Sequence, residues 1–397
     1  RRDFKSSGND AFYFVINPFN DRMSGYYFGT SPYGVQSEAI IQNGGASVSR
    51  HSASTNPSWD NKWFVEVQQY EDRWVAEMAI PFSTLRFKEG VENWRVNFCR
   101  VDYGHNEHSN WNHIPRNFSF SSLANTGIIS WDASPVKPGS NISLIPYVST
   151  GLTRDYELDK PTDWVKGIGG DAKIGLSSSL NLDLTVNPDF SQVEVDDQVT
   201  QLDRFEIFFP EKRQFFLENN DLFSQFGHRS ARPFFSRRIG IAYDEEEEAY
   251  VSNPILFGAR LSGKLNQDWK IGIMDMQTAQ DAGSMTPSTN YAVATVHRRV
   301  FERSGMAAFL VNKNPVKRLS GECDTCEFEA FNRVGGLDFN LASADNWWTG
   351  KLYYHHSFEE TATDDAYSHG AELRYDNGNI DLEWSHQMVG KDYNAEV

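Results

Sequence analysis

The sequence of 397 residues has little of what several protein classes require. Its three cysteines are too few for a disulfide-stabilised scaffold. No apolar run approaches the roughly 18 residues that a transmembrane helix needs. Lys and Arg total 37 against 54 Asp and Glu, a formal net charge of −17, so no basic surface for nucleic acid is expected. Phosphate-loop, Gly-x-Ser-x-Gly and His-Glu-x-x-His motifs are absent from the sequence.

The sequence is instead rich in aromatic residues, with 28 Phe, 16 Tyr and 11 Trp, although its mean hydropathy is only −0.55. Strands that alternate apolar with polar residues produce this combination, because only half of each strand is apolar. Soluble β-domains and membrane β-barrels are both built in this way. At roughly 150 residues per domain, the length fits two or three domains, or a small domain followed by a large β-domain.

Residues 1–132 are predicted to form short strands separated by turns. Apolar and polar residues alternate from Trp63 to Gln69 and again from Arg73 to Ile80. No segment in this region keeps a helical apolar stripe over three turns, so the pattern indicates an antiparallel β-sandwich. Residues 133–140 contain two prolines and a glycine and are predicted to form an exposed linker.

From residue 141 to residue 397 the alternation becomes longer and more regular. Between Phe257 and Leu265 the apolar side chains share one face, whereas Arg260 and Lys264 lie on the other. Such runs are close to the roughly 9–11 residues that a tilted strand needs to cross a bilayer, and tight connections alternate with long polar ones. We therefore predict an antiparallel transmembrane β-barrel over residues 141–397, with a soluble β-domain as the alternative.

The segment 187–238 breaks the alternation. Phenylalanines recur in it among charged residues of both signs, and Pro188, Pro210 and Pro233 prevent continuous regular structure. We predict that this irregular Phe-rich insertion folds into the barrel lumen as a plug or lies across one mouth.

Two groups of potential ligands have competing interpretations. An acidic cluster could bind calcium through carboxylate oxygens, and it comprises Asp189, Glu194, Asp196 and Asp197. We favour the alternative that these carboxylates pair with arginines and lysines of the same segment, and we expect no other cofactor. Cys323 and Cys326 lack a second cysteine pair and a following histidine at finger spacing, so a loop disulfide is preferred over zinc or a redox pair.

Carbohydrate recognition would need an exposed aromatic ring beside amides, because sugars offer apolar faces and hydroxyl groups. The candidates lie in or beside polar loops of the N-terminal region and are Trp111, Asn110, Asn112, Trp59 and Trp63. Trp63 alternates with Val65 and Val67, which favours a position in the core.

No catalytic pair stands out in the sequence. A glycosidase needs two carboxylates that flank a cleft, and 54 acidic residues single out none. Glu77 interrupts an otherwise apolar strand, and we favour a structural role for it over acid catalysis.

Four motifs around the Phe-rich insertion are distinctive, namely Asn187-Pro-Asp-Phe-Ser-Gln-Val-Glu194, Phe208-Phe-Pro-Glu-Lys-Arg213, Phe215-Phe-Leu-Glu218 and Ser236-Arg-Arg-Ile-Gly240. They resemble the signature of domain-of-unknown-function family 5916, which implies a bacterial outer-membrane barrel preceded by a family-9-like carbohydrate-binding module. The N-terminal region is similar to the second half of such a module at Asn17-Pro-Phe-Asn-Asp21, Gly25-Tyr-Tyr-Phe28, Tyr33-Gly-Val-Gln36, Trp74-Val-Ala-Glu-Met-Ala-Ile-Pro-Phe82 and Ser83-Thr-Leu-Arg-Phe87. The resemblance spans nearly the whole chain, and it implies that both the sandwich and the barrel are incomplete here.

These observations lead to one main functional hypothesis and two alternatives. The main hypothesis is an outer-membrane protein of a Gram-negative bacterium, its signal peptide removed, that acts in glycan or nutrient binding or uptake or as an envelope scaffold. Its partners would be outer-membrane lipid, a poly- or oligosaccharide and other envelope proteins, and no nucleic acid. The alternatives are a secreted glycoside hydrolase with a carbohydrate-binding module, and a non-catalytic subunit of a larger envelope complex.

Overall fold

A computed structural model describes residue 4 and residues 8–45, 55–57, 59–136, 142–154, 162–177, 179–188, 211–228, 231–244, 249–280, 287–316, 331–360 and 364–397. Nearly all regular structure in these residues is antiparallel β-sheet, as the alternation predicts. The predicted Asp189–Asp197 cluster and the Cys323–Cys326 pair lie outside the described residues.

The N-terminal domain, residues 8–136, contains a seven-stranded sheet in the order β4-β3-β2-β1-β7-β8, with β9 paired to β7. Its strands are β1 (Ala11–Asn17), β2 (Gly25–Thr30), β3 (Gln36–Ile41), β4 (Thr55–Asn56), β7 (Asn93–Asp102), β8 (Glu107–Asn110) and β9 (Gly127–Ser130). Three short 3-10 turns accompany them, η1 (Asn43–Gly45), η2 (Phe82–Thr84) and η3 (Leu123–Asn125).

One face of this sheet is covered by a hairpin of β5 (Phe64–Gln69) and β6 (Trp74–Ala79). Val65 and Met78 point from the hairpin into an aromatic core that includes the fully buried Phe28 and Trp94. The hairpin face that carries Val65 therefore packs on the core, as its alternation with Trp63 predicts, because residues two apart on a strand share a side.

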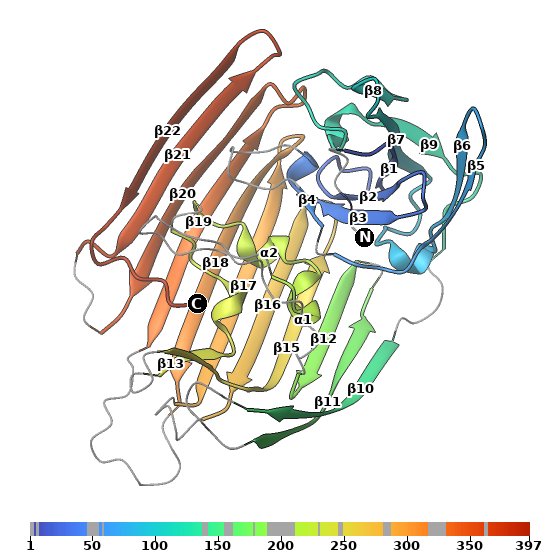
Figure 1. The fold of residues 1–397 in the computed structure, drawn as a ribbon. Coiled ribbons are helices and arrows are strands. Elements are labelled where there is room, and N and C mark those ends of the chain that lie inside the picture. The colour runs from blue at the N-terminus through green and yellow to red at the C-terminus, as the bar shows by residue number, and fades with distance from the viewer. Residues whose placement is uncertain are drawn as a thin grey trace, which may run out of the picture.

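The large sheet has eleven consecutive antiparallel strands, and Figure 1 shows it curving around the segment that carries α1 and α2. The strands are β10 (Ile142–Thr153), β11 (Asp163–Gly175), β12 (Leu180–Val186), β15 (Ile255–Lys264), β16 (Trp269–Thr278), β17 (Thr289–Val300), β18 (Ser304–Pro315), β19 (Asn332–Ala342), β20 (Trp348–Phe358), β21 (Tyr367–Asp376) and β22 (Asp381–Val389). The remaining hairpin pairs β13 (Ile241–Asp244) with β14 (Ala249–Ser252).

The two ends of the large sheet differ in their connections. Tight turns join β11 to β12, β15 to β16, β17 to β18, β19 to β20 and β21 to β22, whereas the intervening connections are longer. Because neighbouring strands are antiparallel, all the tight turns lie at one end of the sheet. We call this end the tight-turn end.

The large sheet has the opposite polarity from a soluble sheet. On β15 the inward Arg260 is only 2% exposed, whereas Phe257 on the outer face is 52% exposed. Buried polar side chains on the inner face include Asn181, Asp183, Thr185, Ser262, Thr295, Asp338, His355, Ser357 and Ser368. Exposed apolar side chains include Val148, Ile168, Val186, Ile273, Leu310, Leu337, Leu352 and Leu382.

The described part of the Phe-rich insertion packs on the inner face of the large sheet. It contains α1 (Gln214–Leu217), α2 (Asp221–Ser224) and the turn η4 (Ser236–Arg238). Its apolar side chains form one core with those of β15 to β19, a core that includes Phe216, Leu222, Phe223, Phe226, Phe234, Met274, Met276, Val293, Phe309 and Val311. We call residues 211–239 the Phe-rich segment. Among the described residues, no helix has the length and apolarity needed to span a membrane.

Candidate functional site

The N-terminal domain, the Phe-rich segment and the large sheet meet at the tight-turn end. Figure 1 shows the N-terminal domain beside this end of the sheet. Asn117 of the domain donates to the Asp376 carboxylate, 3.1 Å away, where β21 enters its tight turn. Buried ion pairs and hydrogen bonds at this junction link the three parts, so we treat it as the candidate site.

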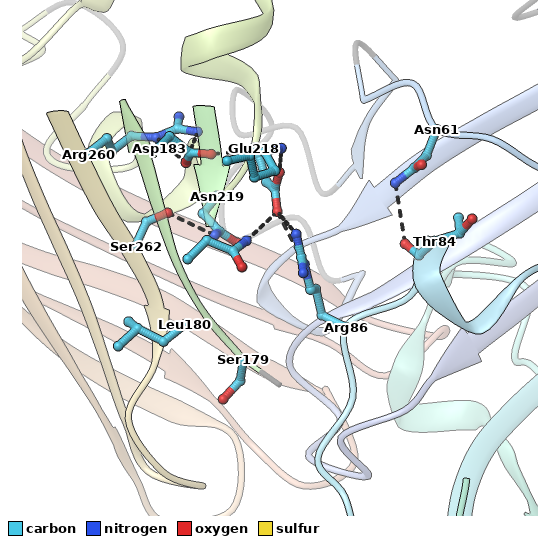
Figure 2. A network of polar contacts seen from close by, with 12 residues as sticks. Asn61, Thr84, Arg86, Ser179, Leu180, Asp183, Glu218, Asn219, Arg260 and Ser262 are labelled. Atoms are coloured by element: carbon cyan, nitrogen blue, oxygen red, sulfur yellow. Dashed lines mark hydrogen bonds and ion pairs between the residues drawn. The ribbon is translucent and has the colours of Figure 1, made fainter. Parts of the chain in front are cut away.

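The first element of the network is an ion pair between Arg86 and Glu218. Arg86 follows η2, and its Nη2 donates to Oε1 of Glu218 at 2.7 Å, with a second bond from Nε at 3.2 Å. The same carboxylate accepts a hydrogen bond from Asn181 at 2.7 Å and pairs with Lys173. Figure 2 shows Glu218 between Arg86 on one side and the strands of the large sheet on the other.

Electrostatics keep Glu218 charged. Burial by itself would raise the pKa of this carboxyl group, but Arg86 and Lys173 outweigh burial and lower the pKa to about 2. The side chains of Arg86 and Glu218 are 18% and 15% exposed, so solvent screens the pair only partly. The N-terminal domain is therefore joined to the Phe-rich segment by a charged contact that persists at neutral pH.

Behind Glu218, the Phe-rich segment is fixed to the wall of the sheet. Asp183 and Arg260 are opposite each other on β12 and β15 and form a buried ion pair of 2.9 Å. The guanidinium of Arg260 also lies over the ring of Phe215, 5.1 Å from its centre. Asn219 donates to the hydroxyl of Ser262 at 3.0 Å, as Figure 2 shows.

A second buried ion pair joins the N-terminal domain directly to the sheet. Asp21 pairs with Lys264 at the end of β15, and the Lys264 ammonium lies 3.6 Å from the centre of the Phe19 ring. Burial alone would raise the pKa of Asp21, but Lys264 and Lys270 outweigh it and hold the pKa well below its usual range. Lys270 donates to the hydroxyl of Ser24 at 2.9 Å.

Deeper in the sheet, Asp338 organises a third group of contacts. Its carboxylate lies 2.7 Å from Nε2 of His355 and 3.2 Å from Nζ of Lys351, and it accepts a hydrogen bond from the backbone N–H of Gly227 at 2.9 Å. Lys351 also donates to the backbone oxygen of Gln225 at 2.7 Å. This group therefore holds the end of α2 against β19 and β20.

The predicted carbohydrate-binding residues lie in two different environments. Trp59 and Trp63 are buried in the aromatic core of the N-terminal domain, where Trp59 packs on Tyr26 and Trp63 packs on Phe28. The indole N–H of Trp63 donates to Glu38 at 3.1 Å. Neither indole has a free face on which a sugar ring could stack. Of the predicted residues, Trp111, Asn110 and Asn112 remain as candidates.

Trp111 is 59% exposed. One part of its ring rests on Gly127, where a Cβ atom would lie 2.3 Å from Cζ3, and Phe98 supports it edge-on at 5.9 Å. Asn112 is committed to the fold, because its side chain donates to the backbone oxygen of Asn125 at 2.9 Å. Asn110 lies at the end of β8, and its buried Oδ1 accepts no hydrogen bond in the described structure. The structure thus offers one supported, exposed indole, whereas the side-chain oxygen of Asn110 is buried.

Candidate metal ligands are not brought together in the described residues. No three His, Cys, Asp or Glu side chains there are close enough to hold a metal ion. Cys99 is a free, buried cysteine on β7. Glu77 is exposed on the hairpin opposite Glu66, on the face that points away from the core.

Sequence reasoning did not identify the ion pairs of the junction. Arg86 and Glu218 both fall within the motifs that carry the family resemblance, which was the available signal. Their separation of 132 residues carries no periodic pattern, and neither does the separation of 243 residues between Asp21 and Lys264. The pairing therefore needed the three-dimensional structure.

Together, the fold and this site define a class of all-β protein, in which a large antiparallel sheet encloses a Phe-rich segment and a small β-domain is fixed to its tight-turn end. More specifically, the chain belongs to the family described as Domain of unknown function (DUF5916), whose model matches residues 138–396. The resemblance inferred from the motifs is confirmed for this part, and the N-terminal domain lies outside the matched residues.

The comparisons with solved structures and with curated sequences add little to this family assignment. The chain is similar to a solved structure described as Wzi, an outer membrane protein involved in group 1 capsule assembly in Escherichia coli and a carbohydrate-binding β-barrel. The identity is 10%, the TM-score is 0.26, and the match covers 97% of this chain and 82% of that one. No curated protein sequence matches the chain.

Proposed function

We propose that the protein is an outer-membrane β-barrel whose N-terminal domain is fixed to the periplasmic mouth and binds glycans of the cell envelope. The observation that carries the membrane assignment is the reversed polarity of the large sheet. Its buried face carries ion pairs such as Asp183–Arg260, and its exposed face carries side chains such as Leu337 and Leu352. In water this arrangement would be costly, whereas in a bilayer the outer face contacts lipid.

Strand length and the placement of aromatic residues support the same assignment. Strands β15 to β22 have 9 to 12 residues each, which matches the roughly 9–11 residues of a tilted membrane strand. Exposed aromatic residues occur near both ends of the strands, with Trp269, Phe301, Trp347 and Trp348 at the tight-turn end and Phe257 and Phe358 at the other. Two such girdles are typical of membrane barrels.

The same rules support a periplasmic position for the N-terminal domain. Outer-membrane barrels have short periplasmic turns and longer extracellular loops. The contacts of the domain, Asp21–Lys264 and Asn117–Asp376, lie at the tight-turn end. The domain would then sit in the periplasm, where cell-wall and imported glycans are accessible.

The exposed indole of Trp111 supports the glycan-binding part of the proposal. A sugar ring can stack on the exposed face of an aromatic side chain of this kind. Such a surface on a membrane-fixed domain would retain a poly- or oligosaccharide at the mouth of the barrel, for uptake or for attachment of the envelope.

Membrane fractionation tests the location. We expect the protein, expressed with a secretion signal in a Gram-negative host, to sediment with the outer membrane and to resist extraction by high salt and carbonate. Detergent should release it in a form that migrates differently on gels before and after heating. Recovery in the soluble periplasmic fraction without detergent would overturn the membrane assignment.

Replacing Trp111 by alanine tests the glycan site. The indole stacks on Gly127 without filling the core, so W111A should fold normally. Loss of stacking, worth about 0.5–1.5 kcal/mol, should weaken retention on insoluble polysaccharides by about two- to tenfold. Phe64 is another exposed aromatic residue of the same domain and provides the matched control, F64A. Equal retention of W111A and F64A would contradict the assignment.

A further inference from the structure

A pair of histidines lies on the outer face of the large sheet, apart from the junction and from Trp111. His369 on β21 and His386 on β22 face each other with 3.3 Å between their Nε2 atoms. The rings are tilted by 35°, with 5.4 Å between their centres, so they meet through these nitrogens and not through their faces. Both residues lie in the half of their strands that is away from the tight turn.

The alternation of β21 and β22 places the pair on the apolar face of the sheet. Ser368 is fully buried on the inner side and Leu373 is 38% exposed on the outer side, and His369 shares the side of Leu373. His386 is opposite Ala371 and has the same orientation. The other outward residues of these strands are Tyr367, Tyr375, Leu382, Trp384 and Met388. An imidazole in such surroundings is costly unless its nitrogens have partners.

Met388 adds a third potential ligand. It is the register partner of His369, lies two residues from His386 on the same face, and is 43% exposed. Directly opposite residues have Cβ atoms about 4.5–5.5 Å apart, which the flexible methionine side chain can span. Two imidazoles and a thioether are therefore near enough to share one ion. This set differs from the His, Cys, Asp and Glu groups considered above, because it includes methionine.

The separation of the two nitrogens suits a bound metal ion. An ion about 2.0–2.1 Å from each nitrogen, with tetrahedral or trigonal angles, holds the nitrogens roughly 3.3–3.6 Å apart. The observed 3.3 Å lies at the lower end of that range. A hydrogen bond between the two rings accounts for the same distance, but it makes no use of Met388. The methionine therefore distinguishes the two interpretations.

The ligand types and their surroundings select the ion. Thioether ligands are soft and favour Cu(I) over harder divalent ions. The outward residues of β21 and β22 include no carboxylate, so the charge of a bound ion stays uncompensated beside an apolar surface. The cost of placing a charge there is smaller for a monovalent ion than for a divalent ion. Cu(I) satisfies both conditions.

We propose that His369, His386 and Met388 form a binding site for the soft monovalent ion Cu(I) on the outer face of the large sheet. The site is independent of glycan binding. The proposed membrane position contributes only to the choice of a monovalent ion, and its failure would appear in the fractionation experiment and not in a metal titration.

Titration of the whole detergent-solubilised chain with Cu(I) tests the proposal, under ascorbate and in competition with the chromophoric ligand bicinchoninate. Cysteines also bind Cu(I), so every variant carries C323S and C326S, and the buried Cys99 is common to all. We expect H386F and M388L each to weaken binding at least about tenfold, because even the loss of a group that only orients a ligand costs 10–100-fold. Both replacements put an apolar side chain on an apolar face, so the fold should be retained.

M306L is the matched control, because Met306 on β18 is 51% exposed, and it should bind like the parent. X-ray absorption of the bound copper should show two nitrogen neighbours and one sulfur, and M388L should lose the sulfur. The proposal is overturned if H386F and M388L bind as M306L does, if M388L alone has no effect, or if an equal concentration of Zn(II) displaces the copper.

Discussion

Replacing Glu218 by leucine is expected to destabilise the docking of the N-terminal domain by about 3 kcal/mol. Removal of one partner from a buried ion pair costs about 3–5 kcal/mol, because the other charge remains buried without compensation. Glu218 serves both Arg86 and Lys173, so E218L leaves Arg86 without its carboxylate and leaves Lys173 with Asp183, 3.9 Å away. We place the effect at the lower end of the range because the pair is partly exposed.

The measurement is urea unfolding of the solubilised protein followed by tryptophan fluorescence, since the N-terminal domain contains a cluster of buried indoles. A double-mutant cycle with R86L isolates the contribution of the pair. E218L and R86L should each lower the unfolding midpoint, and the double variant should lose less than the sum of the two. Additive losses would show that Arg86 and Glu218 do not stabilise docking as a pair.

The interaction between Arg86 and Glu218 should weaken as the pH falls. The pKa of Glu218 is lowered from 4.5 in its ordinary state to about 2 in the folded protein. A group with a depressed folded pKa stabilises the fold fully above its unfolded pKa and loses this effect as pH falls through the folded value. The coupling between Arg86 and Glu218 should therefore be constant above about pH 5 and disappear as the pH approaches about 2. Coupling that grew on acidification would contradict this account.

The all-β fold was predictable from the sequence because its signal is local. Alternation between Phe257 and Leu265 assigns Arg260 and Lys264 to one face, and the structure buries both on the inner side. A period of two requires only that neighbouring residues point in opposite directions. The same reasoning identified the core face of the hairpin that contains Val65.

The candidate site was less predictable because its geometry depends on long-range packing. Trp59 and Trp111 both stand among polar residues in the sequence, yet one is buried and the other is largely exposed. Which indole meets solvent depends on whether Tyr26 and Phe28 lie beside it, and local composition does not contain that information. The Arg86–Glu218 pair was unpredictable for the same reason, because the two segments that carry these residues meet only after the sheets have folded and packed together.

Replacing Leu337 by arginine gives the second large effect and separates a membrane barrel from a soluble one. Leu337 lies in the middle of β19 and is 61% exposed on the outer face. In a soluble protein such a surface substitution changes the free energy of unfolding by less than about 0.5 kcal/mol. On the lipid face of a barrel, an arginine near the midplane costs about 2–4 kcal/mol.

Reversible urea unfolding from lipid vesicles measures the cost of L337R against a matched control, N379R. Asn379 is an exposed residue of the tight turn between β21 and β22, outside the proposed hydrocarbon region, so the same charge there should cost little. We expect L337R to lower the free energy of unfolding by at least about 2 kcal/mol more than N379R does. Equal effects would mean that water surrounds both positions, and the exposed leucines of the large sheet would then need another protein surface, not lipid, to cover them.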